Sequence, residues 1–190
     1  MNLLIFDLDG TLVDCKDLHR ESFRHAINYQ CPDIKFDDNE IEGLPTPVKI
    51  NYLRNKGYKL TNDLDIIKRD YTNNNIHKYI KFNQELLDHF NRLYKKYKLC
   101  LASNSRSEYV FKCMNILKLW HFSAVYTRDY GPAKPDPWMY NECIRVVNTT
   151  PYNTVIFEDS PVGIEGAKKT TTNVIEIKDS NHLIEKLYEF

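Results

Sequence analysis

The stretch Leu3-Leu4-Ile5-Phe6-Asp7-Leu8-Asp9-Gly10-Thr11 begins as an apolar run and ends in a polar turn that carries two carboxylates. An apolar run as short as residues 3–6 is typical of a strand buried on both faces of a parallel sheet. Asp7 and Asp9 follow this run, at the point where open α/β sheets bind their ligands. Two carboxylates in one space repel each other unless a cation compensates them, and Mg²⁺ prefers such oxygen ligands. We therefore expect a buried strand with a cation-binding end.

Four later apolar runs have the same character, and helical patterns lie between the later ones. One amphipathic pattern spans about residues 85–97, and another is centred on residues 139–147. Strands and helices that alternate in this way form right-handed βαβ units. The pattern predicts an α/β fold: a Rossmann-like parallel sheet with helices on both faces. The four later runs are residues 99–102, 124–126, 154–157 and 174–177.

A long segment without a convincing strand separates the first apolar run from the second. Helical periodicity occurs within this segment near residues 17–30, 48–56 and 64–79. We therefore expect two domains. Residues 1–14 and 81–190 would form the α/β core, and residues 15–80 would form a small helical cap inserted after the first strand.

Composition narrows the class of protein. The 190 residues include 26 Lys and Arg against 26 Asp and Glu, so the formal net charge is zero. Binders of nucleic-acid polymers or anionic membranes normally carry a basic excess, and no apolar run approaches the roughly 18–20 residues of a membrane span. The five cysteines form no C-x-x-C pair, which favours free thiols. We expect a cytoplasmic protein that binds neither nucleic-acid polymers nor membranes.

Three further segments carry polar groups at predicted strand ends or in a rigid turn. Ser103 and Asn104 follow the second strand, where hydroxyl, amide and backbone N–H groups can bind phosphoryl oxygens. Lys134 lies in a proline-flanked turn ahead of a helix, which suits an ammonium that neutralises phosphate charge. Glu158 and Asp159 follow the strand at residues 154–157 and offer further oxygen ligands for a metal.

In this order and spacing the four segments resemble the haloacid dehalogenase superfamily. The resemblance covers nearly the whole chain. The chain is similar to the subgroup with a small helical cap, which contains many sugar-phosphate phosphatases and β-phosphoglucomutase. The motifs that carry it are Asp7-Leu8-Asp9-Gly10-Thr11, Ser103, Lys134-Pro135-Asp136-Pro137 and Phe157-Glu158-Asp159-Ser160-Pro161-Val162-Gly163-Ile164-Glu165.

The resemblance implies catalytic roles for particular residues. Asp7 would attack phosphorus in line and form an aspartyl-phosphate intermediate. Asp9 would protonate the leaving oxygen and then deprotonate the hydrolytic water. Ser103 and Lys134 would bind the transferred phosphoryl group, and Lys134 would also orient Asp7. Asn104 would either add a donor there or cap the turn.

The resemblance also implies a metal site and a cofactor. Mg²⁺ would be held by Asp7, by the backbone carbonyl of Asp9 and by Asp159. Glu158 would act on the ion through bound water. The retained Asp9 favours chemistry on a phosphate ester, since dehalogenases of the superfamily lack an acid at this place.

Two residues of the predicted cap bear on substrate choice. His19 matches a histidine that in relatives helps to position the acid/base aspartate, although packing within the cap is an equal alternative. The segment Glu42-Gly43-Leu44-Pro45-Thr46 resembles the cap loop that selects substrate. Thr46 stands where the mutase has an arginine for a second phosphate, so the sequence favours hydrolysis over mutase activity.

The combined expectation is a Mg²⁺-dependent phosphatase that hydrolyses a small phosphorylated metabolite. A sugar phosphate, phosphoglycolate or a nucleotide monophosphate would be the type of phosphate ester, and the protein would be a monomer or homodimer. Two alternatives stay open at this point: a β-phosphoglucomutase-like phosphomutase, and a non-catalytic binding module on the same fold.

Overall fold

The computed structural model describes residues 2–37, 40–41 and 46–190. The chain divides into two compact units. Met1–Cys15 and Ile80–Phe190 form one, here called the core unit, and Lys16–Tyr79 form the other, here called the helical unit.

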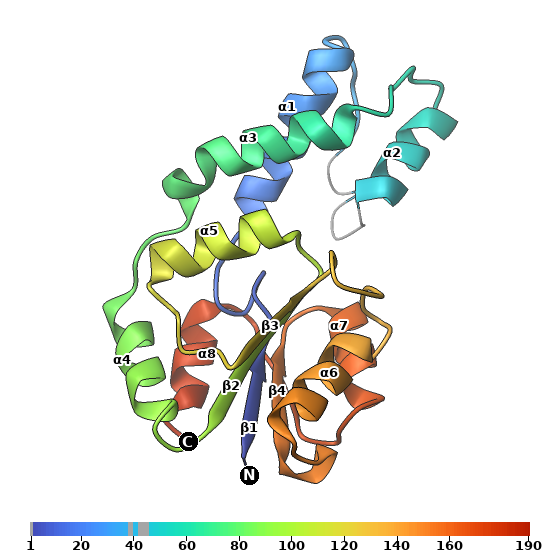
Figure 1. Ribbon diagram of the computed structural model, residues 1–190. Coiled ribbons are helices and arrows are strands. Elements are labelled where there is room, and N and C mark those ends of the chain that lie inside the picture. The colour runs from blue at the N-terminus through green and yellow to red at the C-terminus, as the bar shows by residue number, and fades with distance from the viewer. Residues whose placement is uncertain (1, 38–39, 42–45) are drawn as a thin grey trace. The chain divides into compact units, whose positions relative to one another are not determined.

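A five-stranded, wholly parallel sheet forms the centre of the core unit (Figure 1). Its spatial order is β3-β2-β1-β4-β5, so β1 occupies the middle of the sheet. The predicted α/β fold and the insertion of helices between β1 and β2 are thereby confirmed. The strands are β1 (Leu3–Phe6), β2 (Lys98–Ser103), β3 (Ala124–Thr127), β4 (Thr154–Glu158) and β5 (Val174–Glu176).

Helices cover both faces of this sheet, with α6 and α7 on one side and α4 and α8 on the other (Figure 1). The predicted helix at residues 85–97 is too long, because α4 ends at Leu93 and the N–H of Tyr97 bonds back to the Leu93 carbonyl in a turn. Neither α5 nor α8 was predicted from periodicity. The helices are α4 (Gln84–Leu93), α5 (Ser107–Leu117), α6 (Trp138–Val147), α7 (Pro161–Lys168) and α8 (Ser180–Leu187), with a short 3₁₀ turn at Pro151–Asn153.

The two faces of the sheet bury different side chains. On the α6 face, Leu3, Ile5 and Ile156 pack in one cluster with Met139 and Tyr140. On the opposite face the packing is aromatic: the Phe6 ring stacks on Phe157 at 4.8 Å and lies 5.0 Å from Phe90. Since β1 is buried on both faces, every one of its residues is apolar.

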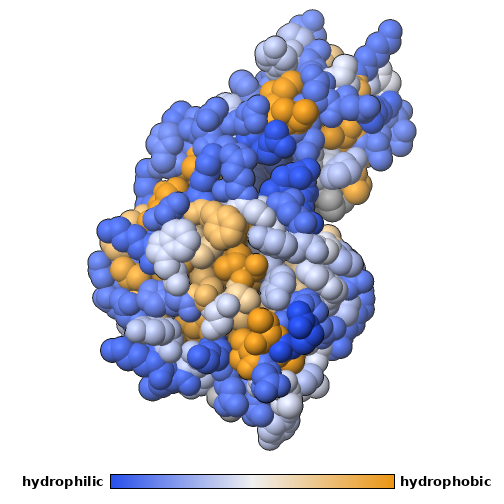
Figure 2. All heavy atoms as spheres, in the orientation of Figure 1, coloured by the Kyte–Doolittle hydropathy of each residue, from blue (hydrophilic) through white to orange (hydrophobic). Residues whose placement is uncertain are grey.

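The helical unit contains α1 (Lys16–Gln30), α2 (Thr46–Asn55) and α3 (Leu64–Tyr79). Its core is a separate cluster that includes Phe23, Ile27 and Leu53. Figure 2 shows that hydrophilic residues predominate on the surface of this unit seen from this side. No helix in the described part of the chain is both long enough and apolar enough to cross a membrane.

We predict that Phe6→Ala lowers the free energy of unfolding of the core unit by about 3–5 kcal/mol, because the truncation removes buried aromatic contacts and leaves a cavity. Phe6 is 0% exposed, whereas Tyr152 is 87% exposed. Denaturant titration followed by circular dichroism would measure the change. Tyr152→Ala is the matched control and should lie within about 0.5 kcal/mol of the wild type; an equal loss in both variants would contradict the prediction.

Candidate active site

Parallel pairing brings three predicted site residues to one edge of the sheet. Phe6 lies beside Leu101 of β2 and Phe157 of β4. Asp7 therefore leaves β1 next to the ends of both neighbouring strands, and its N–H donates to the Phe157 carbonyl at 3.0 Å. Ser103 is the last residue of β2 and Glu158 the last residue of β4. All three are buried.

The ammonium of Lys134 lies between two carboxylates at this edge. Its Nζ donates to Asp7 Oδ1 at 2.5 Å and to Glu158 Oε2 at 2.7 Å. Lys134 is 6% exposed, Asp7 5% and Glu158 0%. Burial alone lowers the pKa of Lys134, but the two carboxylates outweigh it and raise that pKa above its ordinary value, so the ammonium stays charged. One positive charge thus serves two buried carboxyl groups.

Glu158 is held on both of its oxygens. Besides Lys134, Oε2 accepts the hydroxyl of Tyr140 at 2.8 Å. Oε1 accepts the hydroxyl of Ser160 at 2.7 Å and its N–H at 3.2 Å. Gly163 lets helix α7 approach this carboxylate, because a Cβ there would stand 2.1 Å from Glu158. Glu158 therefore anchors Lys134. The sequence predicted only a role near a metal for this residue and did not suggest the contact to the lysine.

The side chain of Asn104 contacts the backbone of Lys134. Its Oδ1 accepts the Lys134 N–H at 2.8 Å, and its Nδ2 donates to the Lys134 carbonyl at 3.3 Å. The side chain therefore clamps the turn that carries the ammonium, a contact that the sequence did not predict. The neighbouring Ser103 hydroxyl oxygen accepts the N–H of Ser105 at 3.0 Å.

Asp9 lies in the turn after β1 and accepts two hydrogen bonds that the sequence did not predict. Ser105 Oγ donates to Oδ2 at 2.5 Å, and Cys15 Sγ donates to Oδ1 at 3.1 Å. Burial and the nearby Asp9 carboxylate raise the pKa of the Cys15 thiol, which keeps it protonated as a donor. All five cysteines are free thiols, as expected.

Asp159, the remaining carboxylate, has an unsatisfied oxygen. Its Oδ1 is buried and has no hydrogen-bond partner among the described residues. Gly10 has φ +87°, and a Cβ at this position would lie 2.0 Å from Asp159 Oδ2, so only glycine leaves room for the carboxylate. Burial, followed by the charge of Glu158, raises the pKa of Asp159 to about 6.

The donor set at this edge fits a divalent cation. Carboxylate oxygens of Asp7, Glu158 and Asp159 lie within 4.8 Å of one another. Burial, followed by the charge of Glu158, raises the pKa of Asp7 as well. The three carboxylates outnumber the one ammonium that contacts them. Hard oxygen donors, an unsatisfied buried oxygen and excess negative charge together suit Mg²⁺.

Two predicted site residues belong to the helical unit instead. His19 lies on α1, and Thr46 is the first residue of α2. Both are half-buried. Residues 42–45 of the predicted substrate loop lie outside the described residues.

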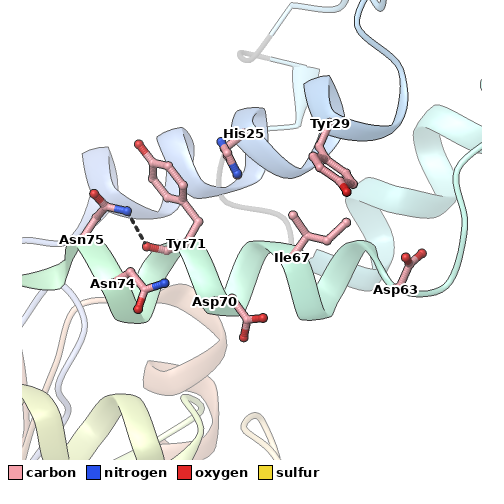
Figure 3. Close-up of a pocket in the computed structure, with 8 residues that line it drawn as sticks. All are labelled: His25, Tyr29, Asp63, Ile67, Asp70, Tyr71, Asn74 and Asn75. Carbon is pink, nitrogen blue, oxygen red and sulfur yellow. Dashed lines mark hydrogen bonds between the residues drawn. The ribbon is translucent and has the colours of Figure 1, made fainter.

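A separate pocket of about 340 Å³ opens between α1 and α3 of the helical unit (Figure 3). The ring of His25 stacks on that of Tyr71 at 4.3 Å, and Tyr29 and Ile67 lie at the same groove. Its lining in the described part of the chain contains none of the predicted site residues.

The chain is similar in sequence to named phosphatases and in fold to solved structures. A phosphorylated carbohydrates phosphatase from Thermotoga maritima is 27% identical over 177 residues, covering 88% of this chain and 81% of that protein. A pyrophosphatase PpaX from Listeria innocua is 23% identical over 179 residues, covering 89% of this chain and 79% of that protein. The crystal structure of β-phosphoglucomutase from Clostridium difficile shares the fold, with a TM-score of 0.71, 18% identity and coverage of 100% of this chain and 98% of that one.

The family model for haloacid dehalogenase-like hydrolases matches residues 4–177, from the first residues of β1 to the residue after β5. This range contains each motif on which the resemblance was based. The chain belongs to the haloacid dehalogenase-like hydrolase family.

Proposed function

We propose that this hydrolase is a Mg²⁺-dependent phosphatase that cleaves small phosphate monoesters through an aspartyl-phosphate intermediate on Asp7. The observation that carries the proposal is the buried Lys134 ammonium, 2.5 Å from Asp7 Oδ1 and backed by Glu158 at 2.7 Å. A lysine held in this way keeps one Asp7 oxygen in place and leaves positive charge beside the position of a phosphoryl group.

In the first step Asp7 attacks phosphorus, and a bond forms between its carboxylate oxygen and the phosphorus atom while the ester P–O bond breaks. Asp9, protonated at the start, transfers its proton to the leaving alcohol oxygen. The hydrogen bonds from Ser105 and Cys15 hold both oxygens of Asp9 in one orientation, which fixes the direction of proton transfer. The ammonium of Lys134 and the hydroxyl of Ser103 would bind the phosphoryl oxygens during transfer.

In the second step a water molecule attacks phosphorus, and the bond between phosphorus and Asp7 breaks. Asp9 takes a proton from this water and so returns to its starting state. The products are inorganic phosphate and a regenerated Asp7 carboxylate. No residue beyond those of the first step is required.

Asp7, Asp159 and the backbone carbonyl of Asp9 would hold the Mg²⁺ ion, with Glu158 acting through water. When bound, the ion supplies positive charge that neutralises phosphoryl oxygens and lowers the repulsion between anionic substrate and carboxylate. The three carboxylates that gather around one ammonium at the strand ends support this assignment.

The proposed substrates are small phosphorylated metabolites: sugar phosphates, phosphoglycolate or nucleotide monophosphates. The Thermotoga maritima relative, named for phosphorylated carbohydrates, supports placing sugar phosphates first in a screen. The Listeria innocua relative supports adding inorganic pyrophosphate. The cytoplasmic location and the monomeric or homodimeric state stay predictions.

We predict that Asp7→Asn lowers the rate of phosphate release by more than about 1,000-fold, because the amide cannot serve as the nucleophile. The wild type and the variant would be compared across the substrate panel with Mg²⁺ present. Equal rates for the two proteins on every compound would overturn the proposed function. Phosphorus NMR on the active compounds would show hydrolysis; isomerisation of a sugar phosphate without release would instead indicate a phosphomutase.

Loss of the metal site should be detectable from the melting temperature, without an activity assay. We predict that Mg²⁺ raises the melting temperature of the wild type and that Asp159→Asn abolishes this shift, since the variant lacks a carboxylate at the unsatisfied position. Asp88→Asn, at an exposed position on α4, is the control and should keep the wild-type shift. Chelation with EDTA should also stop phosphate release; a shift of wild-type size in Asp159→Asn would show that the ion binds elsewhere.

The clamp on Lys134 gives a separate prediction. Asn104→Ala removes two hydrogen bonds to the Lys134 backbone and should lower kcat by up to about 30-fold, because the two bonds together contribute about 2 kcal/mol to holding the turn. Steady-state kinetics would measure the effect. Asn115→Ala, at an exposed position on α5, should keep the wild-type kcat. An unchanged kcat in Asn104→Ala would show that the turn is held without the clamp.

A further inference from the structure

Tyr140 is a buried polar residue that the proposed reaction does not use. It lies on α6, is 0% exposed and belongs to the apolar cluster beneath the sheet. Its hydroxyl donates to Glu158 Oε2 at 2.8 Å, with the Gly163 carbonyl 3.3 Å away as a second acceptor. A hydroxyl in such a place costs free energy unless it is hydrogen-bonded, so packing alone would be met equally well by phenylalanine.

The oxygen that accepts the Tyr140 hydroxyl also accepts the Lys134 ammonium. Glu158 Oε2 therefore has two donors, one charged and one neutral. The same ammonium donates to Asp7 Oδ1 at 2.5 Å. Both carboxylates thus attract the same ammonium, and a hydroxyl that satisfies part of Oε2 weakens the pull of Glu158 on the lysine.

The ring of Tyr140 also contacts the lysine. Lys134 Nζ lies 5.2 Å from the ring centroid, within the range of a cation–π interaction. Burial raises the pKa of the Tyr140 hydroxyl, which keeps it a neutral donor. The ring of Tyr140 therefore limits the position of Lys134 Nζ on one side. Its hydroxyl weakens the attraction between Glu158 and the same ammonium.

We propose that Tyr140 is a positioning residue: through its hydrogen bond to Glu158 it keeps the Lys134 ammonium on Asp7, where the phosphoryl group is transferred. This inference rests on the proposed function for its kinetic consequence only. The contact geometry that it explains is independent of the substrate.

The kinetic test uses Tyr140→Phe, which keeps the ring and removes the hydroxyl. We expect kcat to fall by about 10-fold, which corresponds to one hydrogen bond to a charged group, with KM changed less than about 2-fold. Tyr126→Phe, a half-buried tyrosine on β3, is the matched control and should keep the wild-type kcat. All rates are expressed per folded protein, measured from the melting transition of each variant.

A double-mutant cycle separates positioning from a merely structural role. In the Glu158→Gln background, where the carboxylate no longer competes for the ammonium, Tyr140→Phe should lower kcat by less than about 2-fold. Equal effects in both backgrounds, or an unchanged kcat in Tyr140→Phe alone, would overturn the proposal.

A crystal structure of Tyr140→Phe supplies a readout that does not depend on activity. We expect Lys134 Nζ to lie closer to Glu158 than to Asp7, the reverse of the present order. An unchanged Nζ position overturns the proposal even if the enzyme is active. If the wild type releases no more phosphate than Asp7→Asn, the proposed function fails, and this structural comparison still decides the role of Tyr140.

Discussion

The buried ammonium of Lys134 is the interaction on which the rest of the site depends. Asp7, Glu158 and Asp159 bring three carboxyl groups to the ends of two neighbouring strands, where their mutual repulsion would oppose folding. Lys134 compensates part of this charge from a turn far away in the sequence. Because removal of one partner of a buried ion pair leaves an uncompensated charge, each member constrains the others.

Much of the surrounding structure serves to hold this lysine. Asn104 fixes the backbone of its turn from the end of β2, and Glu158 fixes its ammonium from the end of β4. Glycines at positions 10 and 163 leave space for the Asp159 and Glu158 carboxylates, which a Cβ at either place would meet at 2.1 Å or less. Because Lys134 neutralises only part of the carboxylate charge, the site suits a divalent cation and, with that cation, an anionic substrate.

Local sequence patterns predicted the five strands well, because a strand buried on both faces of a parallel sheet is apolar without interruption. Helices were predicted less evenly: periodicity placed α6 correctly but extended the helix ending at Leu93 by four residues. The pairs Tyr140–Glu158 and Cys15–Asp9 escaped prediction for a different reason. A tyrosine or cysteine on an apolar face has the same pattern as any core residue, and only its hydroxyl or thiol partner reveals another role.

The sequence by itself determined the sheet, the insertion of helices after β1, the family and the chemical types of the groups at the strand ends. These properties follow from runs of neighbouring residues, whose spacing is preserved in the folded chain. Only the tertiary structure decided that Asn104 clamps the Lys134 backbone and that one oxygen of Glu158 accepts hydrogen bonds from both Lys134 and Tyr140. The physical reason is that such contacts join separate segments through packing, and hydrogen-bond partners chosen across a sheet leave no trace in local spacing.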